Sequence, residues 1–319
     1  MIHKLGIKRL LITGASGFIG RRLVEHLLSA DLELVLLGRS IPESLSLRTP
    51  DNVKFLHCDF SDPSSLDRHR STLEFVDAVA HLGGAVPHSS APEQDDPVRN
   101  IRVNAEATAV LLGHLSPKLK CFCYTSTMDV YGAPVVLPLG ENHPTLPTSQ
   151  YAVTKLAVEG LLRVHATRMG VSVGILRVSH VYGPGDTSSK AIPKFIREVR
   201  SGRAPVIYGN GSDTRDYVYV DDVVQAILLS LGKSINGTVN VATGHATSMN
   251  DLVTTILRLM NSALTPARKP RDRTPTQIFA SIDRARDLLG YRPVVQLEDG
   301  LRRTIEWFRG EEERAKGYC

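Results

Sequence analysis

The sequence predicts an α/β protein in which a doubly wound, Rossmann-like parallel sheet carries a smaller C-terminal substrate-binding lobe. Up to about residue 175, short apolar runs alternate with helical patterns, as in a parallel sheet with helices on both faces. The first run, Arg9–Thr13, leads through a glycine-rich turn into a helical pattern. We therefore expect residues 1–175 to form a nucleotide-binding domain, to which later segments return, and residues 176–319 to form mainly the lobe.

The remaining elements follow from apolar periodicity and from flanking turn residues. Strands are expected at residues 32–37, 53–57, 77–82, 171–176 and 206–208. Helices are expected at residues 21–28, 192–199, 221–231 and 248–260.

Three glycines in the first turn predict a site for a dinucleotide. Gly14 permits a tight turn, Gly17 lets a pyrophosphate approach the backbone, and Gly20 allows the helix to pack closely on the strand. The N-terminus of the helix also attracts an anion. The spacing is G-x-x-G-x-x-G instead of the usual G-x-G-x-x-G, and a turn without a ligand is the alternative.

The end of the second strand predicts which cofactor is bound. Arg39 suits the 2′-phosphate of NADP, whereas an acidic residue would hold the ribose hydroxyl of NAD. No Asp or Glu occurs between Glu33 and Glu43. We therefore expect NADP(H), with NAD as the second possibility and a merely solvated Arg39 as the alternative. After the next two strands, Asp59 is placed to reach the adenine, and Gly83-Gly84 lets a cofactor lie close.

Tyr151 and Lys155 predict acid/base chemistry. A Tyr and a Lys four residues apart lie on one face of a helix. The ammonium can then lower the pKa of the phenol, so that the Tyr exchanges a proton with a substrate hydroxyl. Ordinary amphipathic surface is the alternative interpretation of this pair.

The glycine turn and the Tyr151/Lys155 pair occur together with further segments over nearly the whole chain. These segments are Tyr124–Gly132, Leu176–Arg177 with Val181–Gly185, Arg215–Asp222, Asn240–Gly244, Leu288–Pro293 and the helical pattern at 301–307. In this order they resemble the extended short-chain dehydrogenase/reductase family, in particular its nucleotide-sugar epimerases, dehydratases and ketoreductases.

The resemblance implies roles for individual residues. Thr127 would be a catalytic hydroxyl, Tyr151 the acid/base, and Lys155 a ligand of the nicotinamide ribose that tunes Tyr151. Ser126 and Thr127 would also contact substrate, and Arg215 would lie near its diphosphate. The full set of expected cofactor-binding residues is Gly14, Ser16, Gly17, Phe18, Ile19, Gly20, Arg39, Asp59, Phe60, Leu82, Gly83, Gly84, Thr125, Tyr151 and Lys155.

Two departures from the family pattern concern the chemistry and the substrate. The dehydratases carry Thr-Asp-Glu where this chain has Thr127-Met128-Asp129. Met128 cannot donate a proton, so a dehydratase is not expected. His180 replaces the usual Asn before Val-Tyr-Gly-Pro. We expect His180 to bind substrate, charged beside a phosphate or carboxylate, or else to be packed and bonded to the backbone.

The leading expectation is an NADP-dependent oxidoreductase that reduces a 4-keto-deoxysugar linked to a nucleotide diphosphate. The alternative is an NAD-dependent nucleotide-sugar 4-epimerase, for which Gly83-Gly84 would leave room for the keto-sugar to rotate. A non-catalytic nucleotide-sensing protein of the same fold is less favoured, because Tyr151 and Lys155 are both present. The Arg215–Asp222 segment argues against a ketone that carries no sugar.

The composition excludes several other classes. The chain has 319 residues and a net charge of +5. Aromatic residues make up only 6% and no nucleic-acid motif occurs, so a nucleic-acid-binding protein is not expected. An anionic substrate explains the positive charge. A basic run at 268–273 is expected to be a solvated loop, with a loop that closes over a nucleotide as the alternative. The four cysteines do not form a zinc pattern, so no metal and no disulfide is expected.

No apolar run reaches membrane-spanning length and the first residues lack a signal-peptide core, so we expect a cytoplasmic protein without a membrane partner. The family resemblance also implies a homodimer, formed through the helix that carries Tyr151 and the segment at 98–112.

Overall fold

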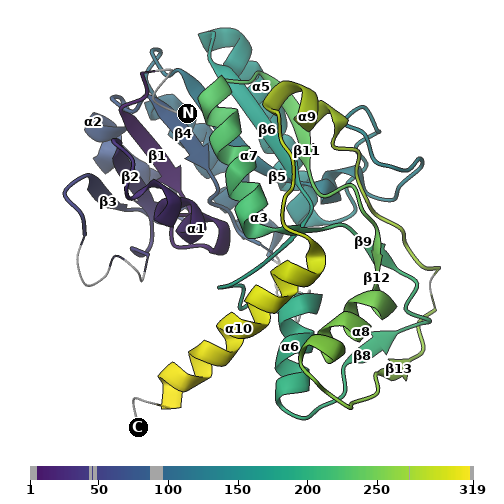
Figure 1. Cartoon of the computed structure of the whole chain (residues 1–319). Helices are drawn as coiled ribbons and strands as arrows, with labels where there is room; N and C mark the ends of the chain where they lie inside the picture. The colour runs from purple at the N-terminus through teal and green to yellow at the C-terminus, as the bar shows by residue number, and fades with distance from the viewer. Residues whose placement is uncertain (1–5, 43–44, 46–48, 87–95, 273, 317–319) are drawn as a thin grey trace.

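The computed structural model describes residues 6–42, 45, 49–86, 96–272 and 274–316, and it has the expected α/β architecture (Figure 1). A parallel sheet of seven strands forms the larger part. From one edge to the other its strands are β11 (Gly237–Val241), β6 (Ser172–Val178), β5 (Cys121–Thr127), β4 (Ala78–His81), β1 (Arg9–Thr13), β2 (Glu33–Gly38) and β3 (Val53–His57). The strand order reverses between β1 and β4, where doubly wound sheets bind their ligands.

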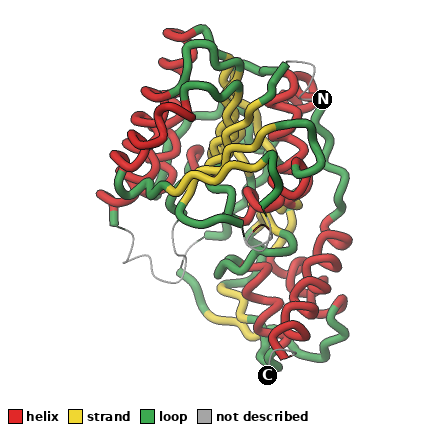
Figure 2. The backbone as a smooth tube through the Cα atoms, turned by 90° about the vertical axis from the view of Figure 1, so that its left-hand side faces the viewer, coloured by secondary structure: helices red, strands yellow, loops and turns green. Residues whose placement is uncertain are grey.

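Helices cover both faces of this sheet, which explains why its strands are apolar almost throughout (Figures 1 and 2). One face packs against α1 (Phe18–Leu27), α7 (Val220–Lys233) and α9 (Asp283–Leu289). The other face packs against η3 (Pro63–His69), α2 (Arg70–Leu73), α4 (Ala107–His114) and α5 (Gln150–Met169). A short α3 (Pro97–Ile101) and a π-helical turn, η5 (Arg102–Glu106), precede α4.

The smaller lobe lies beyond the carboxyl ends of the strands, in the lower part of Figures 1 and 2. It has three two-stranded pairs, β7 (His180–Tyr182) with β10 (Tyr217–Tyr219), β9 (Thr214–Arg215) with β12 (Thr247–Ser248), and β8 (Val206–Tyr208) with β13 (Ala267–Lys269). Its helices are α6 (Ala191–Arg200), α8 (Met249–Leu259) and α10 (Leu297–Lys316).

Asp216 joins the lobe to the main sheet. Its carboxylate is fully buried and accepts hydrogen bonds from the Thr243 backbone (2.8 Å), the Thr243 hydroxyl (2.7 Å) and the Gly244 backbone (3.0 Å), just beyond β11. Its carbonyl accepts from the backbone of His180 at 3.2 Å. Because these donors, together with the Ser179 hydroxyl and the Ala280 backbone, converge on one residue, β7 and β10 are fixed relative to the end of the sheet.

The basic run at 268–273 is exposed at Arg268 and Lys269, as expected, but it is not a loop throughout. Arg268 belongs to β13 and donates to the Asn210 carbonyl (2.9 Å) and to Asn250 (3.0 Å). Arg271 forms an ion pair with Asp213. Arg273 lies outside the described residues.

The first turn is as tight as the glycines predict. Gly14 has a positive φ of 69°, and a Cβ on Gly20 would lie 2.0 Å from the Gly14 carbonyl oxygen. The helix therefore begins at Phe18, three residues earlier than predicted, because the turn itself provides the first helical residues. Gly14 also lies against Gly83, whose nitrogen would be 2.7 Å from a Cβ on Gly14.

Gly20→Ala is expected to lower the free energy of unfolding by about 2 kcal/mol, as overpacking of a rigid backbone contact does. Gly113→Ala in α4 is the matched control, since nothing lies within 4 Å of its added methyl group. That change should be neutral or stabilise by up to about 1 kcal/mol. Chemical denaturation of both variants checks this, and equal effects would contradict the close packing at Gly20.

Candidate active site

The glycine turn presents a helix N-terminus that no side chain caps. Gly17 is the N-cap residue of α1, and the first turn contains no acidic residue. The backbone N–H groups that follow it, beginning with Phe18 and Ile19, are therefore available to an anion. Ser16 is partly buried within the same turn. This arrangement fits the pyrophosphate of a dinucleotide, as the glycine spacing predicts.

Leu82, Gly83 and Gly84 run beside this turn. The backbone N–H groups of Leu82 (3.1 Å) and Gly83 (2.9 Å) donate to the hydroxyl of Thr13. A Cβ on Gly83 would lie 3.0 Å from that hydroxyl, and one on Gly84 would lie 2.9 Å from Asn104 Oδ1. The two glycines are needed for packing within the protein, so they are no evidence for space in which a sugar could rotate.

His81 was not among the predicted residues, yet it links this region to α4. Its Nδ1 lies 2.7 Å from the Thr13 hydroxyl and its Nε2 lies 2.9 Å from the Thr108 hydroxyl. Because Thr13 accepts from two backbone groups, its own proton goes to Nδ1, and Nε2–H donates to Thr108. Burial between the rings of Phe60 and Tyr124 lowers the pKa of His81 to about 3, so the ring is neutral. A histidine within the otherwise apolar run of β4 was the signal available in the sequence.

Arg39 and Asp59 lie together at the edge of the sheet formed by β2 and β3. Asp59 accepts from the backbone of Ser61 at 2.9 Å. This hydrogen bond, with attraction from Arg39 and from Arg99 in α3, lowers the pKa of Asp59. Arg39 is exposed. The structure thus brings an acidic and two basic groups to the expected place of the adenosine.

Tyr151 and Lys155 lie in the first two turns of α5, which begins after Ser149. The Ser149 hydroxyl accepts from the Ala152 backbone at 3.2 Å and so caps the helix. Lys155 is only 4% exposed, and its Nζ lies 4.4 Å from the ring centre of Tyr124 and 5.9 Å from that of Tyr151. Within the described part of the chain, neither the Tyr151 hydroxyl nor the Lys155 ammonium makes a hydrogen bond. Both are therefore available to a ligand.

Burial dominates the ionisation of this pair. It raises the pKa of Tyr151, and the Asp129 carboxylate raises it further. The expectation that Lys155 lowers the pKa of the phenol toward neutrality is therefore wrong for the protein without ligands. Burial also lowers the pKa of Lys155 to about 7, while attraction from Glu159 acts in the opposite direction.

The end of β5 carries the three predicted hydroxyl residues. The Thr127 oxygen accepts from the backbone of Asp129 at 3.2 Å, where η6 (Met128–Tyr131) begins. Thr125 donates to the carbonyl of His81 at 3.3 Å. Successive residues point to opposite faces of the strand, and Ser126 donates to the buried Glu159 at 2.7 Å. The Ser126 hydroxyl is thus used inside the protein, in contrast to the substrate contact expected of it.

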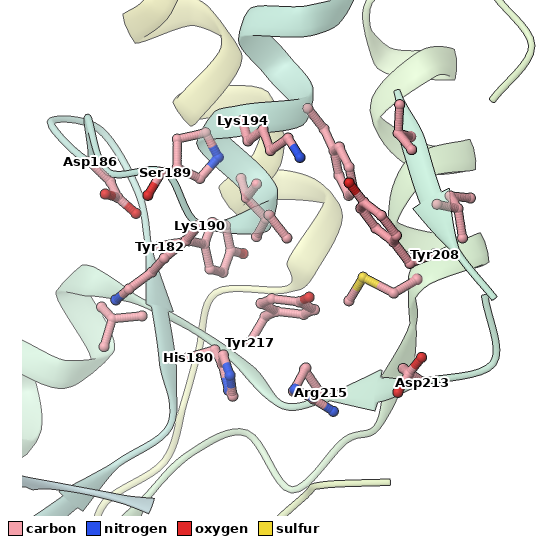
Figure 3. Close-up of a pocket in the computed structure, with 18 of the residues that line it drawn as sticks. His180, Tyr182, Asp186, Ser189, Lys190, Lys194, Tyr208, Asp213, Arg215 and Tyr217 are labelled. Carbon is pink, nitrogen blue, oxygen red and sulfur yellow. The ribbon is translucent and has the colours of Figure 1, made fainter. Parts of the chain in front are cut away.

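A cavity of about 500 Å³ lies in the smaller lobe (Figure 3). Its lining combines cations, carboxylates and aromatic rings, among them His180, Lys190, Lys194, Tyr208, Asp213, Arg215, Tyr217 and Arg271. Arg215, which was predicted, donates to the Thr276 hydroxyl at 2.9 Å. Sequence reasoning missed the remaining cations because their common location depends on the folding of the lobe.

His180 lies at this cavity but is not charged. Burial first, and then repulsion from Arg215 and Lys190, lowers its pKa to about 3. Its ring meets Tyr217 edge to face at 5.9 Å. Its buried Nδ1 has no hydrogen-bond partner among the described residues. In the absence of a bound anion His180 is therefore neutral, and no backbone group of the described residues bonds to its Nδ1.

Comparison with known sequences also indicates a dinucleotide-dependent enzyme. A sequence model of the NAD dependent epimerase/dehydratase family matches residues 10–242. The chain belongs to this family. It is therefore an enzyme of the extended short-chain dehydrogenase/reductase group, as the resemblance implied.

Individual members of this epimerase/dehydratase family match over the whole chain. The UDP-glucose 4-epimerase of Mycolicibacterium smegmatis is 34% identical, over 95% of this chain and 99% of its own. The structure of Thermotoga maritima UDP-glucose 4-epimerase with UDP-glucose is 30% identical, with a TM-score of 0.85 over 95% of this chain and 99% of that one. The Thermus thermophilus UDP-glucose 4-epimerase complex with NAD is 28% identical, with a TM-score of 0.81 and the same coverage.

Two other kinds of feature, a membrane-spanning helix and a metal site, are not found among the described residues. No helix among them is long and apolar enough to cross a membrane. No group of three or more His, Cys, Asp or Glu side chains is arranged there to hold a metal ion.

Lys155→Met is expected to stabilise the protein measured without added cofactor. The pKa of Lys155 falls from 10.5 to about 7 on folding, so the unfolded chain binds the proton more tightly between these pH values. The buried Lys155 therefore lowers the free energy of unfolding by its full amount below pH 7, and this destabilisation disappears as the pH rises toward 10.5. We expect a gain of at least about 1 kcal/mol in the free energy of unfolding at pH 6, since each pKa unit corresponds to about 1.4 kcal/mol.

Denaturation at several pH values checks this prediction, with the exposed Lys118→Met as control. A Lys155→Met protein less stable than wild type at pH 6 would show that the buried ammonium stabilises the fold.

Proposed function

We propose that this protein is an NAD-dependent 4-epimerase of a UDP-linked sugar. The observation that carries the proposal is the similarity to UDP-glucose 4-epimerases over both lobes, combined with the Tyr151/Lys155 pair beside the end of β5. The buried side chain of Met128 stands where a dehydratase has an acid, and a thioether cannot donate a proton.

The dinucleotide would be held by the uncapped end of α1, by the close approach of Gly14 and Gly83, and by Lys155. A Cβ on Gly14 would collide with the Gly83 backbone, so glycine is required for the first turn to lie against the end of β4. The uncapped N–H groups of α1, with no acidic residue in its first turn, fit the pyrophosphate of the group. NAD, when bound, supplies the capacity to oxidise and then reduce the sugar carbon.

Tyr151 and Thr127 perform the proton chemistry on the sugar hydroxyl in this proposal. Tyr151 as phenolate takes the proton from the 4-hydroxyl, and the phenol returns it to the oxygen once the sugar presents its other face. The Lys155 ammonium would offset part of the rise that burial causes in the pKa of Tyr151, and the Thr127 hydroxyl donates to the sugar oxygen. The proton is given back in the second half, so the reaction has no net proton exchange.

The nucleotide diphosphate would occupy the cavity of the smaller lobe. Arg215, Lys190 and Lys194 line it, which suits a diphosphate, and Tyr208 offers a ring on which a base can stack (Figure 3). Neutral His180 can donate one hydrogen bond and accept another, as the Asn of the family does.

Reduction of a 4-keto-sugar by NADPH is the second candidate. Arg39 and Arg99, on either side of Asp59, favour it, because two guanidinium groups suit a 2′-phosphate. The two candidates differ in whether the cofactor is exchanged during turnover.

The deciding experiment identifies the nucleotide released when freshly purified protein is denatured, together with an assay of UDP-glucose and UDP-galactose interconversion without added cofactor. The proposal predicts near-stoichiometric NAD and interconversion. Release of NADP(H), or an empty protein that consumes NADPH with a keto-sugar, would replace the epimerase with the reductase.

Tyr151→Phe should reduce kcat by at least about a hundredfold, since proton transfer by a positioned group contributes about that much or more. The affinity for UDP, measured by calorimetry, should stay within about twofold, because the cavity does not include Tyr151. Retained kcat would remove Tyr151 from the mechanism.

We also propose that two copies pair through α3 and α5, as the family resemblance implies. Apolar side chains are exposed there in unusual number, namely Val98, Ile101, Val153, Leu161 and Val164. Val153→Glu with Val164→Glu should give a monomer in light scattering, whereas Val294→Glu, at a still more exposed position, should leave the mass unchanged. A wild-type monomer would contradict the pairing.

A further inference from the structure

A buried ion-pair network lies directly behind the acid/base pair and takes no part in the proton transfer described above. Its centre is Glu159, which is fully buried one helical turn beyond Lys155. The carboxylate accepts from the Ser126 hydroxyl at 2.7 Å, from Arg177 at 2.7 and 3.0 Å, and from Arg163 at 2.7 Å. Glu159 therefore ties α5 to the ends of β5 and β6.

We propose that Glu159 is a positioning residue of the active site, which fixes the end of β5 through Ser126 and keeps the neighbouring Lys155 cationic. The inference deepens the proposed function, since it assigns a role within the same acid/base site.

The positional part of this role follows from the hydrogen bonds. Ser126 immediately precedes Thr127, so a displacement of Ser126 moves the hydroxyl that faces the sugar oxygen in the proposed reaction. Arg177 is held in turn, because its guanidinium lies 4.7 Å from the ring centre of Tyr131. Tyr131 donates to the buried Asn240 at 2.6 Å. The carboxylate is thus anchored at both of its oxygens by groups that cannot easily move.

The electrostatic part depends on which charges face Lys155. Tyr124 of β5 and Tyr151 of α5 present rings, and His81 of β4 is neutral. Glu159 is the anion among the described residues that opposes the effect of burial on Lys155. Burial alone would raise the pKa of Glu159, but its hydrogen bonds with Arg177 and the attraction of that guanidinium outweigh burial and lower it. Glu159 therefore stays ionised at neutral pH.

Glu159→Gln keeps the shape of the side chain and removes its charge. In the wild type, Lys155 loses its proton near pH 7. Without the negative charge of Glu159, the pKa of Lys155 should fall further, so the ammonium is lost at a lower pH. The alkaline limb of the kcat profile should therefore move to lower pH. A change of one pKa unit would lower kcat about tenfold on the alkaline side and far less at acidic pH.

Two further variants separate this role from a merely structural one. Arg163→Met removes the partially exposed partner of the same carboxylate and should leave the pH profile unchanged. Glu159→Gln combined with Arg177→Met removes the buried charge of both partners, so no unpaired guanidinium destabilises the fold. The double variant should approach wild-type Tm and still show the displaced alkaline limb.

Ser126→Ala tests the positional part, because it removes the contact with β5 and retains the carboxylate. It should lower kcat severalfold at all pH values without displacing the alkaline limb. An unchanged kcat would restrict the role of Glu159 to the charge on Lys155.

The second readout is independent of turnover. NAD affinity of protein stripped of cofactor, measured by calorimetry across pH, should fall at a lower pH in both Glu159→Gln proteins than in wild type. Identical affinity profiles and identical alkaline limbs in wild type and in the double variant would overturn the inference. If wild type interconverts no UDP-sugars, the proposed epimerase fails, and the calorimetric comparison still decides the role of Glu159.

Discussion

The burial of a lysine ammonium at the edge of the sheet is the constraint on which the site depends. Lys155 is 4% exposed, and the nearest compensation is the ring of Tyr124 and the carboxylate of Glu159. An amine in this environment is close to losing its proton, which makes it responsive to small changes in the charges around it. The helix cap at Ser149, the ion pair between Glu159 and Arg177, and the packing of α5 on β5 all serve to hold this one group in place.

A second constraint sets where the cavity of the smaller lobe lies relative to the Lys155 ammonium. Asp216 collects hydrogen bonds from the chain beyond β11 and from the start of β7, so the wall containing His180 is fixed to the sheet. The lobe contributes the cations, whereas helix α5 on the larger domain contributes Tyr151 and Lys155. A ligand that contacts both must therefore be long and carry its negative charge away from the reacting carbon, as the proposed sugar nucleotide does.

Much of the fold could be predicted from the sequence because local signals agreed. The apolar run of β3, the glycines of the first turn and the spacing of Tyr151 and Lys155 each depend on neighbouring residues only. The features that were missed or predicted wrongly depend on partners far away in the chain. The raised pKa of Tyr151 comes from burial under other elements, and the hydroxyl of Ser126 meets a carboxylate 33 residues later. The neutral state of His81 follows from its burial, and its orientation follows from two threonines that no sequence pattern connects to it.

The ion pair between Asp213 and Arg271 at the cavity has a consequence for exchange. A carboxylate seated on the guanidinium is an internal competitor for any diphosphate that approaches it. Two sugar nucleotides that differ only in the configuration of one carbon carry the same diphosphate, so this competition weakens both by the same factor. In the proposed epimerase the contact would therefore lower the affinity for both sugar nucleotides alike and favour neither of them over the other.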